Sequence, residues 1–243
     1  MKSLTGERRA VAAAVLAFYS FIYLLLMILQ PVPDWETAFG AMAGVYALGF
    51  FGIVAGYFWA RWYVIGLGLS GVITTLVSLW QMGPEPVFLF WGGTHGAVAL
   101  AMWGESMAKN FDGRAEWRER FHMDEHAVHR LGRAVIRIGI SLPYVLLYAL
   151  APKPDSAAET MLALGALGFA TAGTWAIFRL RTWGIVALAG AAAALAAGAV
   201  HGGVAPAGAI GLNLGACAAV ASILLFAAVV PFVRPAAQFL RGR

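Results

Sequence analysis

The sequence has little charge and almost no cysteine. Asp, Glu, Lys and Arg make up 12% of its 243 residues, about half the share found in a soluble domain. Cys217 is the single cysteine, which excludes an intrachain disulfide and a thiolate metal cluster. Because 61% of the residues are hydrophobic, the composition indicates that lipid is the main solvent of this chain.

Several chemical signatures are also missing. The long apolar runs carry no Asp, Glu, Lys or Arg in their middle thirds, whereas proton- or sodium-coupled carriers and pumps use such groups at depth. No Gly-rich phosphate loop and no H-E-x-x-H motif occurs. The sequence therefore singles out no catalytic residue and no particular cofactor, and it favours a protein that is not an enzyme.

Long hydrophobic runs dominate the remainder of the chain, and a membrane-spanning helix needs roughly 20 such residues. Eight runs qualify, at 10–29, 38–58, 62–81, 86–105, 134–151, 159–178, 183–201 and 208–230. Short connections join them, except for the long segment 106–133. We expect an all-α integral membrane protein with eight transmembrane helices.

Lysine and arginine fall almost entirely on one side of this arrangement. With the N-terminus in the cytoplasm, Lys153 is the only one of the 17 Lys and Arg residues in an outer loop. Because cations collect in short cytoplasmic loops, the pattern predicts cytoplasmic termini and a multi-pass protein of the inner (plasma) membrane. The net positive charge of the chain is then explained by its topology and by attraction to anionic lipid at the cytoplasmic face, so nucleic acid is not expected as a partner.

Two segments of the chain resemble each other. Residues 23–34 align with residues 144–155 at an offset of 121, sharing a tyrosine, three leucines and the P-x-P-D pattern. This similarity predicts two tandem, parallel four-helix repeats, residues 1–105 and 134–243, related by an axis along the membrane normal. Residues 106–133 between them read as a cytoplasmic amphipathic helix. The alternative is chance similarity between apolar segments of low complexity.

One ionisable side chain lies deep in a predicted span. His95 sits half-way along 86–105, next to Thr94 and flanked by glycines, and the repeat places Asn213 opposite this pair. Polar residues at one depth, related by pseudosymmetry, predict a ligand-binding site near the midplane. The alternative is a hydrogen bond that packs the fourth helix against the eighth.

The segment 106–133 contains a second candidate site. His122 and His126 are spaced i, i+4, with Glu119 nearby, and two imidazoles at this spacing can grip a transition metal from one helix face. The alternative is a solvated polar face whose imidazoles titrate near neutral pH.

These observations leave three hypotheses about function. The first is a non-enzymatic transport or ligand-binding module for an apolar or neutral small molecule, such as a lipid, a quinone or a pigment, held between the two repeats. The second is a structural subunit of a larger membrane complex, with other subunits or with further copies of the chain. The third is a membrane enzyme with a metal centre at the cytoplasmic histidine cluster.

Overall fold

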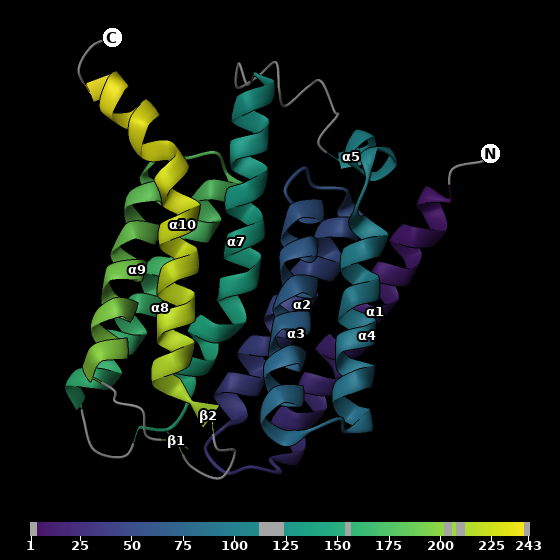
Figure 1. Cartoon of the computed structure of the whole chain (residues 1–243), viewed down its shortest axis with the longest axis vertical. Helices are drawn as coiled ribbons and strands as arrows, with labels where there is room; N and C mark the ends of the chain where they lie inside the picture. Colours follow the sequence, from purple (N-terminus) through teal and green to yellow (C-terminus); the bar gives the residue numbers. More distant parts are fainter. Residues whose placement is uncertain (1–3, 112–123, 154–156, 202–205, 208–211, 241–243) are drawn as a thin grey trace. The chain divides into compact units, whose positions relative to one another are not determined.

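The computed structural model describes residues 4–111, 124–153, 157–201, 206–207 and 212–240. Within these residues the chain forms nine helices and one pair of two-residue strands (Figure 1). The helices are α1 (Thr5–Leu29), α2 (Glu36–Ala55), α3 (Ala60–Met82), α4 (Pro86–Met102), α5 (Glu105–Phe111), α7 (Glu125–Leu150), α8 (Ala157–Phe178), α9 (Trp183–His201) and α10 (Leu214–Leu240). The antiparallel strands are β1 (Pro206–Ala207) and β2 (Leu212–Asn213).

Proline and glycine set most of the helix ends. α1 and α7 each end two residues before a proline, Pro31 and Pro152 respectively, because a proline disfavours helical backbone in the residue before it. Gly83, which follows α3, has φ +87, and Gly104, which follows α4, has φ +104. Glycine reaches this left-handed region without steric cost and so ends a helix readily.

Seven of the described helices, α1, α2, α3, α7, α8, α9 and α10, are long and apolar enough to cross a membrane. The protein is therefore a multi-pass helical membrane protein. The expected span 86–105 differs from the others, because α4 ends at Met102 and α5 begins at Glu105 with a bend of 71° between them.

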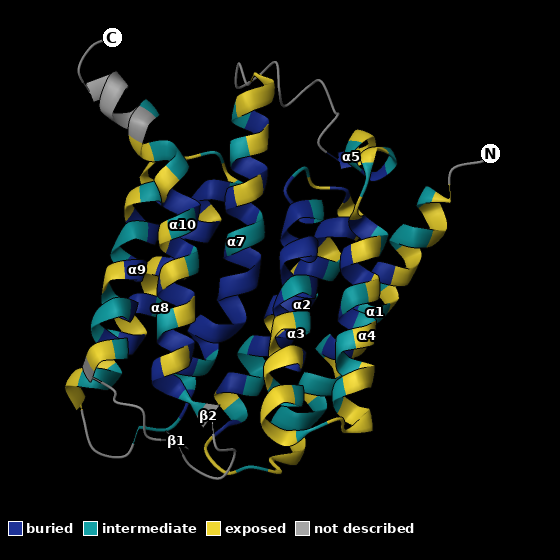
Figure 2. Cartoon of the chain, in the orientation of Figure 1, coloured by how far each residue is buried: buried dark blue, intermediate teal, exposed yellow. Residues whose placement is uncertain are grey.

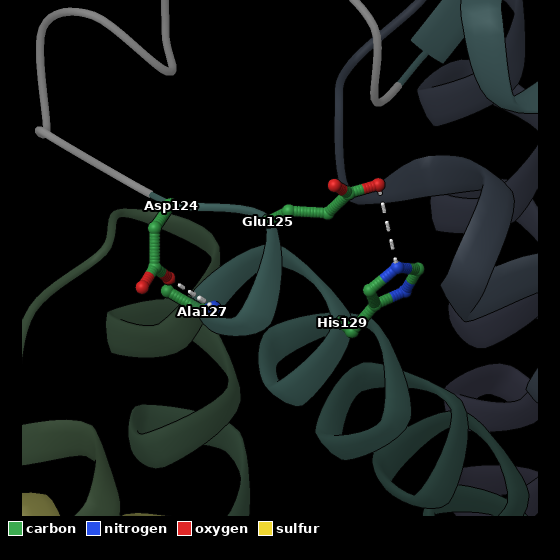
Figure 3. Close-up of polar contacts among 4 residues, drawn as sticks. All are labelled: Asp124, Glu125, Ala127 and His129. Atoms are coloured by element: carbon green, nitrogen blue, oxygen red, sulfur yellow. Dashed lines mark hydrogen bonds and ion pairs between the residues drawn. The ribbon is translucent and has the colours of Figure 1, made fainter.

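Two helices have bounds that differ clearly from the predicted runs. α7 begins at Glu125 and not at residue 134, because an Asp124 side-chain oxygen accepts a hydrogen bond from the Ala127 amide (2.6 Å) and caps the first turn (Figure 3). The last helix runs from Leu214 to Leu240 instead of 208–230, with Pro231 and Pro235 inside it. Proline removes one backbone hydrogen bond, which helices in membranes tolerate when neighbouring groups compensate.

The chain divides into two compact units, and the organisation into repeats at 1–105 and 134–243 stays a prediction. The first unit comprises residues 1–22 and 43–140, and the second comprises residues 23–42 and 141–243. Helices α1, α2 and α7 each contribute residues to both units.

In the first unit, α3 packs against α4 and also meets α7 through glycines. A Cβ atom at Gly66 of α3 would lie 2.2 Å from the carbonyl oxygen of Ile136 on α7. A Cβ atom at Gly139 of α7 would lie 2.6 Å from the carbonyl oxygen of Tyr63 on α3. The two backbones therefore approach more closely than any side chain would allow, as is common where helices pack in lipid.

In the second unit, α9 packs against both α8 and α10. Small residues occupy buried positions of α8, at Ala163, Ala166, Ala170 and Gly173. Figure 2 colours the buried parts of the chain dark blue. Ser222 of α10 donates its hydroxyl to the Ala192 carbonyl of α9 at 2.8 Å. Small residues and interhelical hydrogen bonds replace the hydrophobic effect as the source of helix association in a membrane.

Candidate functional site

His95 lies near the middle of α4 and is only 2% exposed. Its ring occupies space that a side chain on α3 would otherwise fill, because a Cβ atom at Gly71 would lie 2.2 Å from both Cγ and Cδ2 of His95. The neighbouring α3 glycine, Gly68, lies against the His95 carbonyl oxygen in the same way. Glycines on α3 therefore create the room for this imidazole.

Both nitrogens of the His95 ring are hydrogen-bonded. Nδ1 lies 2.8 Å from the carbonyl oxygen of Trp91, and Nε2 lies 2.7 Å from the hydroxyl of Tyr46 on α2. A carbonyl oxygen can only accept, so Nδ1 must carry the proton and donate to it. In the neutral ring Nε2 is then an acceptor, and Tyr46 donates its hydroxyl proton to it.

Three aromatic rings surround the imidazole. The ring centroid of Tyr19 on α1 lies 4.5 Å from that of His95, Trp91 lies at 4.6 Å in a stacked orientation, and Tyr46 lies at 5.7 Å edge-on. All of these partners are neutral. With both nitrogens engaged, the arrangement favours stacking and hydrogen bonding over ligation of a metal or tetrapyrrole iron, which needs an open nitrogen.

Thr94 is joined to the same cluster through Tyr19. Their hydroxyl oxygens lie 2.6 Å apart. Thr94 Oγ1 also lies within hydrogen-bond distance of the Phe90 and Trp91 carbonyl oxygens, at 2.9 and 3.0 Å. Because those carbonyls can only accept, Thr94 donates to them and Tyr19 donates to Thr94.

Thr75 on α3 completes the cluster one helical turn beyond Gly71. It is 6% exposed, and its hydroxyl has no hydrogen-bond partner among the described residues. A Cβ atom at Gly92 of α4 would lie 2.9 Å from Thr75 Oγ1, so this hydroxyl faces the α4 backbone beside Trp91. A buried hydroxyl without a partner is uncommon and calls for an explanation.

Asn213 lies outside the position that the repeat predicts. It belongs to β2 and immediately precedes α10, where its side-chain oxygen accepts a hydrogen bond from the Ala216 amide at 2.9 Å. It therefore acts as a helix cap and does not lie at mid-helix as His95 does. The side chain that is hydrogen-bonded to His95 is that of Tyr46, and an association of Asn213 with a ligand stays a prediction.

The predicted metal-binding face is described only in part. His122 and Glu119 lie outside the described residues, and His126 is exposed in the first turn of α7. Nearby, His129 Nε2 lies 3.9 Å from a carboxylate oxygen of Glu125, and both side chains are exposed (Figure 3). Among the described residues no group of three or more His, Cys, Asp or Glu side chains could hold a metal ion, so metal binding at this face stays a prediction.

Tyr19, Tyr46 and Thr75 are the site residues that sequence reasoning missed. Each lies within an apolar run predicted to span the membrane, whereas tyrosine at the ends of such runs is expected from its preference for the membrane interface. A tyrosine away from those ends has a hydroxyl that needs a buried partner. A tyrosine in the middle of an apolar run therefore indicates that a buried polar partner exists, but it does not identify that partner.

No protein-family model, curated protein or solved structure matches this chain.

Proposed function

We propose that this protein is a non-enzymatic membrane module that binds or transports a neutral, largely apolar small molecule, such as a quinone, a lipid or a pigment. The ligand's polar end lies against the cluster of His95, Tyr46, Tyr19, Thr94 and Thr75 in the first unit. An ionisable residue within a transmembrane segment is a default candidate for a functional site. The partners of His95 are neutral, which favours a ligand without net charge.

The observation that carries this proposal is the hydroxyl of Thr75. Leaving a buried hydroxyl unpaired costs about 1–3 kcal/mol, and a threonine in a helix ordinarily avoids this cost by donating to a carbonyl of the preceding turn. Its neighbour Thr74 does so, at 2.9 Å from the Ser70 carbonyl oxygen. Thr75 has no such bond within the described part of the chain, so its proton is available to a bound molecule.

The hydrogen bonds of the cluster also restrict the ligand's chemistry. The hydroxyl protons of Tyr46, Tyr19 and Thr94 are already committed to His95, Thr94 and carbonyl oxygens respectively. Within the described residues the Thr75 hydroxyl keeps an uncommitted proton, and it requires an acceptor such as a carbonyl oxygen. The stacked rings of Trp91 and His95 supply a flat apolar surface beside it.

We expect Thr75→Val to weaken binding of a carbonyl-bearing apolar probe by up to about tenfold, the equivalent of one net hydrogen bond. The probe is decylubiquinone, titrated against purified protein in detergent and followed by quenching of tryptophan fluorescence. Valine has nearly the same shape as threonine, so the substitution removes the hydroxyl and retains the packing against Gly92.

Thr74→Val is the matched control, because its hydroxyl is satisfied by Ser70 and its side chain is exposed. It should leave the affinity unchanged, and Thr75→Ser should retain wild-type affinity. Equal losses in the two valine variants would contradict a role for Thr75. If the wild-type protein binds neither decylubiquinone nor any co-purifying apolar molecule, the ligand-binding function itself is wrong and the cluster serves only to hold the helices together.

We also propose that the chain crosses the membrane eight times, with α4 as a further span beside the seven long helices. The Arg8 side chain near the start of α1 donates to the Ala101 carbonyl at 3.0 Å, and Arg61 near the start of α3 donates to the Met102 carbonyl at 3.1 Å. The starts of α1 and α3 therefore lie at the same end of the first unit as the finish of α4. This supports a crossing by α4 antiparallel to α3.

The proposed orientation has both termini in the cytoplasm, and Lys153 is its one outer cation. Its ammonium group donates to carbonyl oxygens of Tyr148, Ala149 and Ala151 in the last turn of α7 and just beyond it. A cation is stabilised at the C-terminus of a helix by the helix dipole. Burial lowers the pKa of Lys153, and the negative charge of Glu159 partly opposes this shift. The position of Lys153 in an outer loop is thus explained by its hydrogen bonds to the carbonyl oxygens at the end of α7.

Reporter fusions test this topology. Fusions after Pro33, Glu85 and Pro154 should report an outer location, and fusions after Phe58 and Arg181 should report a cytoplasmic one. The cations at the cytoplasmic ends orient the helices during insertion. A fusion after Glu85 that reports on the same side as one after Phe58 would contradict a crossing by α3 and therefore the eight-helix arrangement.

We further propose that the chain arose from two four-helix repeats joined by an amphipathic linker at 106–133. The helix boundaries support this at the offset found in the sequence, because α1 ends at Leu29 and α7 at Leu150, while α2 begins at Glu36 and α8 at Ala157. The hydrogen bonds that close α1 and α7 correspond as well, from Gln30 to Leu26 and from Ala151 to Leu147.

A further inference from the structure

Arg8 is bound to the end of α4 by several hydrogen bonds. Its Nε donates to the Ala101 carbonyl at 3.0 Å, and its Nη2 donates to the carbonyl oxygens of Leu100 (3.1 Å) and Trp103. Its Nη1 lies 3.4 Å from the Ser106 hydroxyl in α5. The final carbonyls of a helix have no partner within it, so a guanidinium group from α1 contacts two of those in α4, Leu100 and Ala101, and the Trp103 carbonyl just beyond it.

Two further guanidinium groups lie at the same end of the first unit. Arg61 donates to the remaining carbonyl in this series, that of Met102, at 3.1 Å. Arg9 donates from Nη2 to the Val54 carbonyl in the last turn of α2 at 2.7 Å, and its Cζ lies 5.5 Å from the ring centroid of Phe111 in α5. The C-termini of α2 and α4 therefore meet three arginines.

Among the described residues, the positive charges at this end exceed the negative ones. The partners recorded for Arg8 and Arg9 are neutral oxygens and an aromatic ring, and α5 adds the exposed cation Lys109. The C-terminus of a helix contributes roughly half a negative charge. The exposed carboxylates of Glu7 and Glu105 offset part of the remainder, which leaves an excess of positive charge.

The same end has the features of a membrane–water interface. Tyr57, just beyond α2, and Trp103, just beyond α4, are 55% and 59% exposed, and such aromatic residues are enriched where the headgroups lie. α5 turns by 71° from α4 and buries Met107 and Phe111 while Lys109 stays exposed. A half-buried basic cluster at headgroup level favours an anionic lipid over a zwitterionic one.

We infer that this basic cluster, formed by Arg8, Arg9, Arg61 and Lys109, binds the headgroup of an anionic phospholipid. The phosphate is bound by Arg9 and Lys109, to which the described residues offer few polar partners, while Arg8 and Arg61 contribute charge and hold α4. Guanidinium groups match phosphate oxygens in geometry as well as in charge. Tyr57 and Trp103 flank the lipid's glycerol region. This site is independent of the ligand proposed at Thr75.

The test measures retention of phosphatidylglycerol and of phosphatidylcholine by native mass spectrometry of the full-length protein in detergent. Each cation near the surface is worth about 1 kcal/mol, or about fivefold. We expect Lys109→Gln and Arg9→Gln each to lower phosphatidylglycerol affinity about fivefold and to leave phosphatidylcholine binding unchanged. High salt should weaken the wild-type preference because it screens exposed charges.

Arg181→Gln is the matched control, since it removes an exposed cation from the α8–α9 connection, which belongs to the second unit. It should leave phosphatidylglycerol retention at the wild-type level. Lys109→Gln removes no helix-capping hydrogen bond, so we expect this variant to unfold at the wild-type temperature. That result would exclude misfolding as the cause of its lower phosphatidylglycerol affinity. Equal retention of the two lipids by the wild type, or equal losses in Lys109→Gln and Arg181→Gln, would overturn the inference.

Discussion

Gly66→Ala is expected to destabilise the protein by about 3 kcal/mol, at the upper end of the cost of overpacking. The new Cβ atom would lie 2.2 Å from the Ile136 carbonyl oxygen and 3.0 Å from the Cα atom of Gly139. Both atoms belong to the α7 backbone, so no side-chain rotation relieves the contact. The two helices would have to separate at Gly66. This separation would also remove their close approach between Gly139 and the Tyr63 carbonyl.

The measurement is the free energy of unfolding from a denaturant titration in mixed micelles, followed by circular dichroism. Gly93→Ala is the matched control, because nothing lies within 4 Å of a Cβ atom at that helical position. It should leave the stability unchanged or raise it by up to about 1 kcal/mol through helix propensity. Equal stabilities of the two alanine variants would show that α3 and α7 do not meet at Gly66.

His95→Phe is expected to cost about 1–3 kcal/mol, because it leaves the buried Tyr46 hydroxyl without its acceptor. Tyr46 is 1% exposed, so water cannot replace the lost bond. Tyr46→Phe should have a cost in the same range, since it leaves Nε2 of His95 unsatisfied. Removing both polar groups together should be less costly than the sum of the two changes, because neither variant residue then leaves a partner unpaired.

A double-mutant cycle measures this difference as a coupling energy, which averages about 0.6 kcal/mol for hydrogen bonds in membrane proteins and reaches about 1.7. We expect a value near the upper figure for this buried pair. Tyr63→Phe provides the control, because its hydroxyl donates to the Val45 carbonyl at 3.1 Å and not to His95. It should be additive with His95→Phe. A coupling indistinguishable from zero between positions 46 and 95 would contradict the hydrogen bond on which the His95 tautomer rests.

Much of the helix layout could be predicted from local sequence. A long apolar run by itself indicates a lipid environment. A proline or glycine ends the neighbouring helix independently of the rest of the chain, as at Pro31 and Gly83. The same reasoning fails where capping decides the boundary. Asp124 and Asn213 start α7 and α10 with side-chain hydrogen bonds to the backbone, and the local sequence alone does not show which Asp or Asn will form such a bond.

Membrane insertion and the existence of long helices were determined by the sequence itself. Hydropathy depends only on the residues of one span, and the helix-ending effect of proline and glycine depends only on one turn. The partners of His95 and of the arginines were decided only by the tertiary structure. Tyr46 lies 49 residues from His95, and Arg8 lies 93 residues from the carbonyl that it caps. The rotation of each helix about its own axis sets which side chains meet, and in lipid that rotation depends on the fit of glycines such as Gly71 against a neighbouring helix.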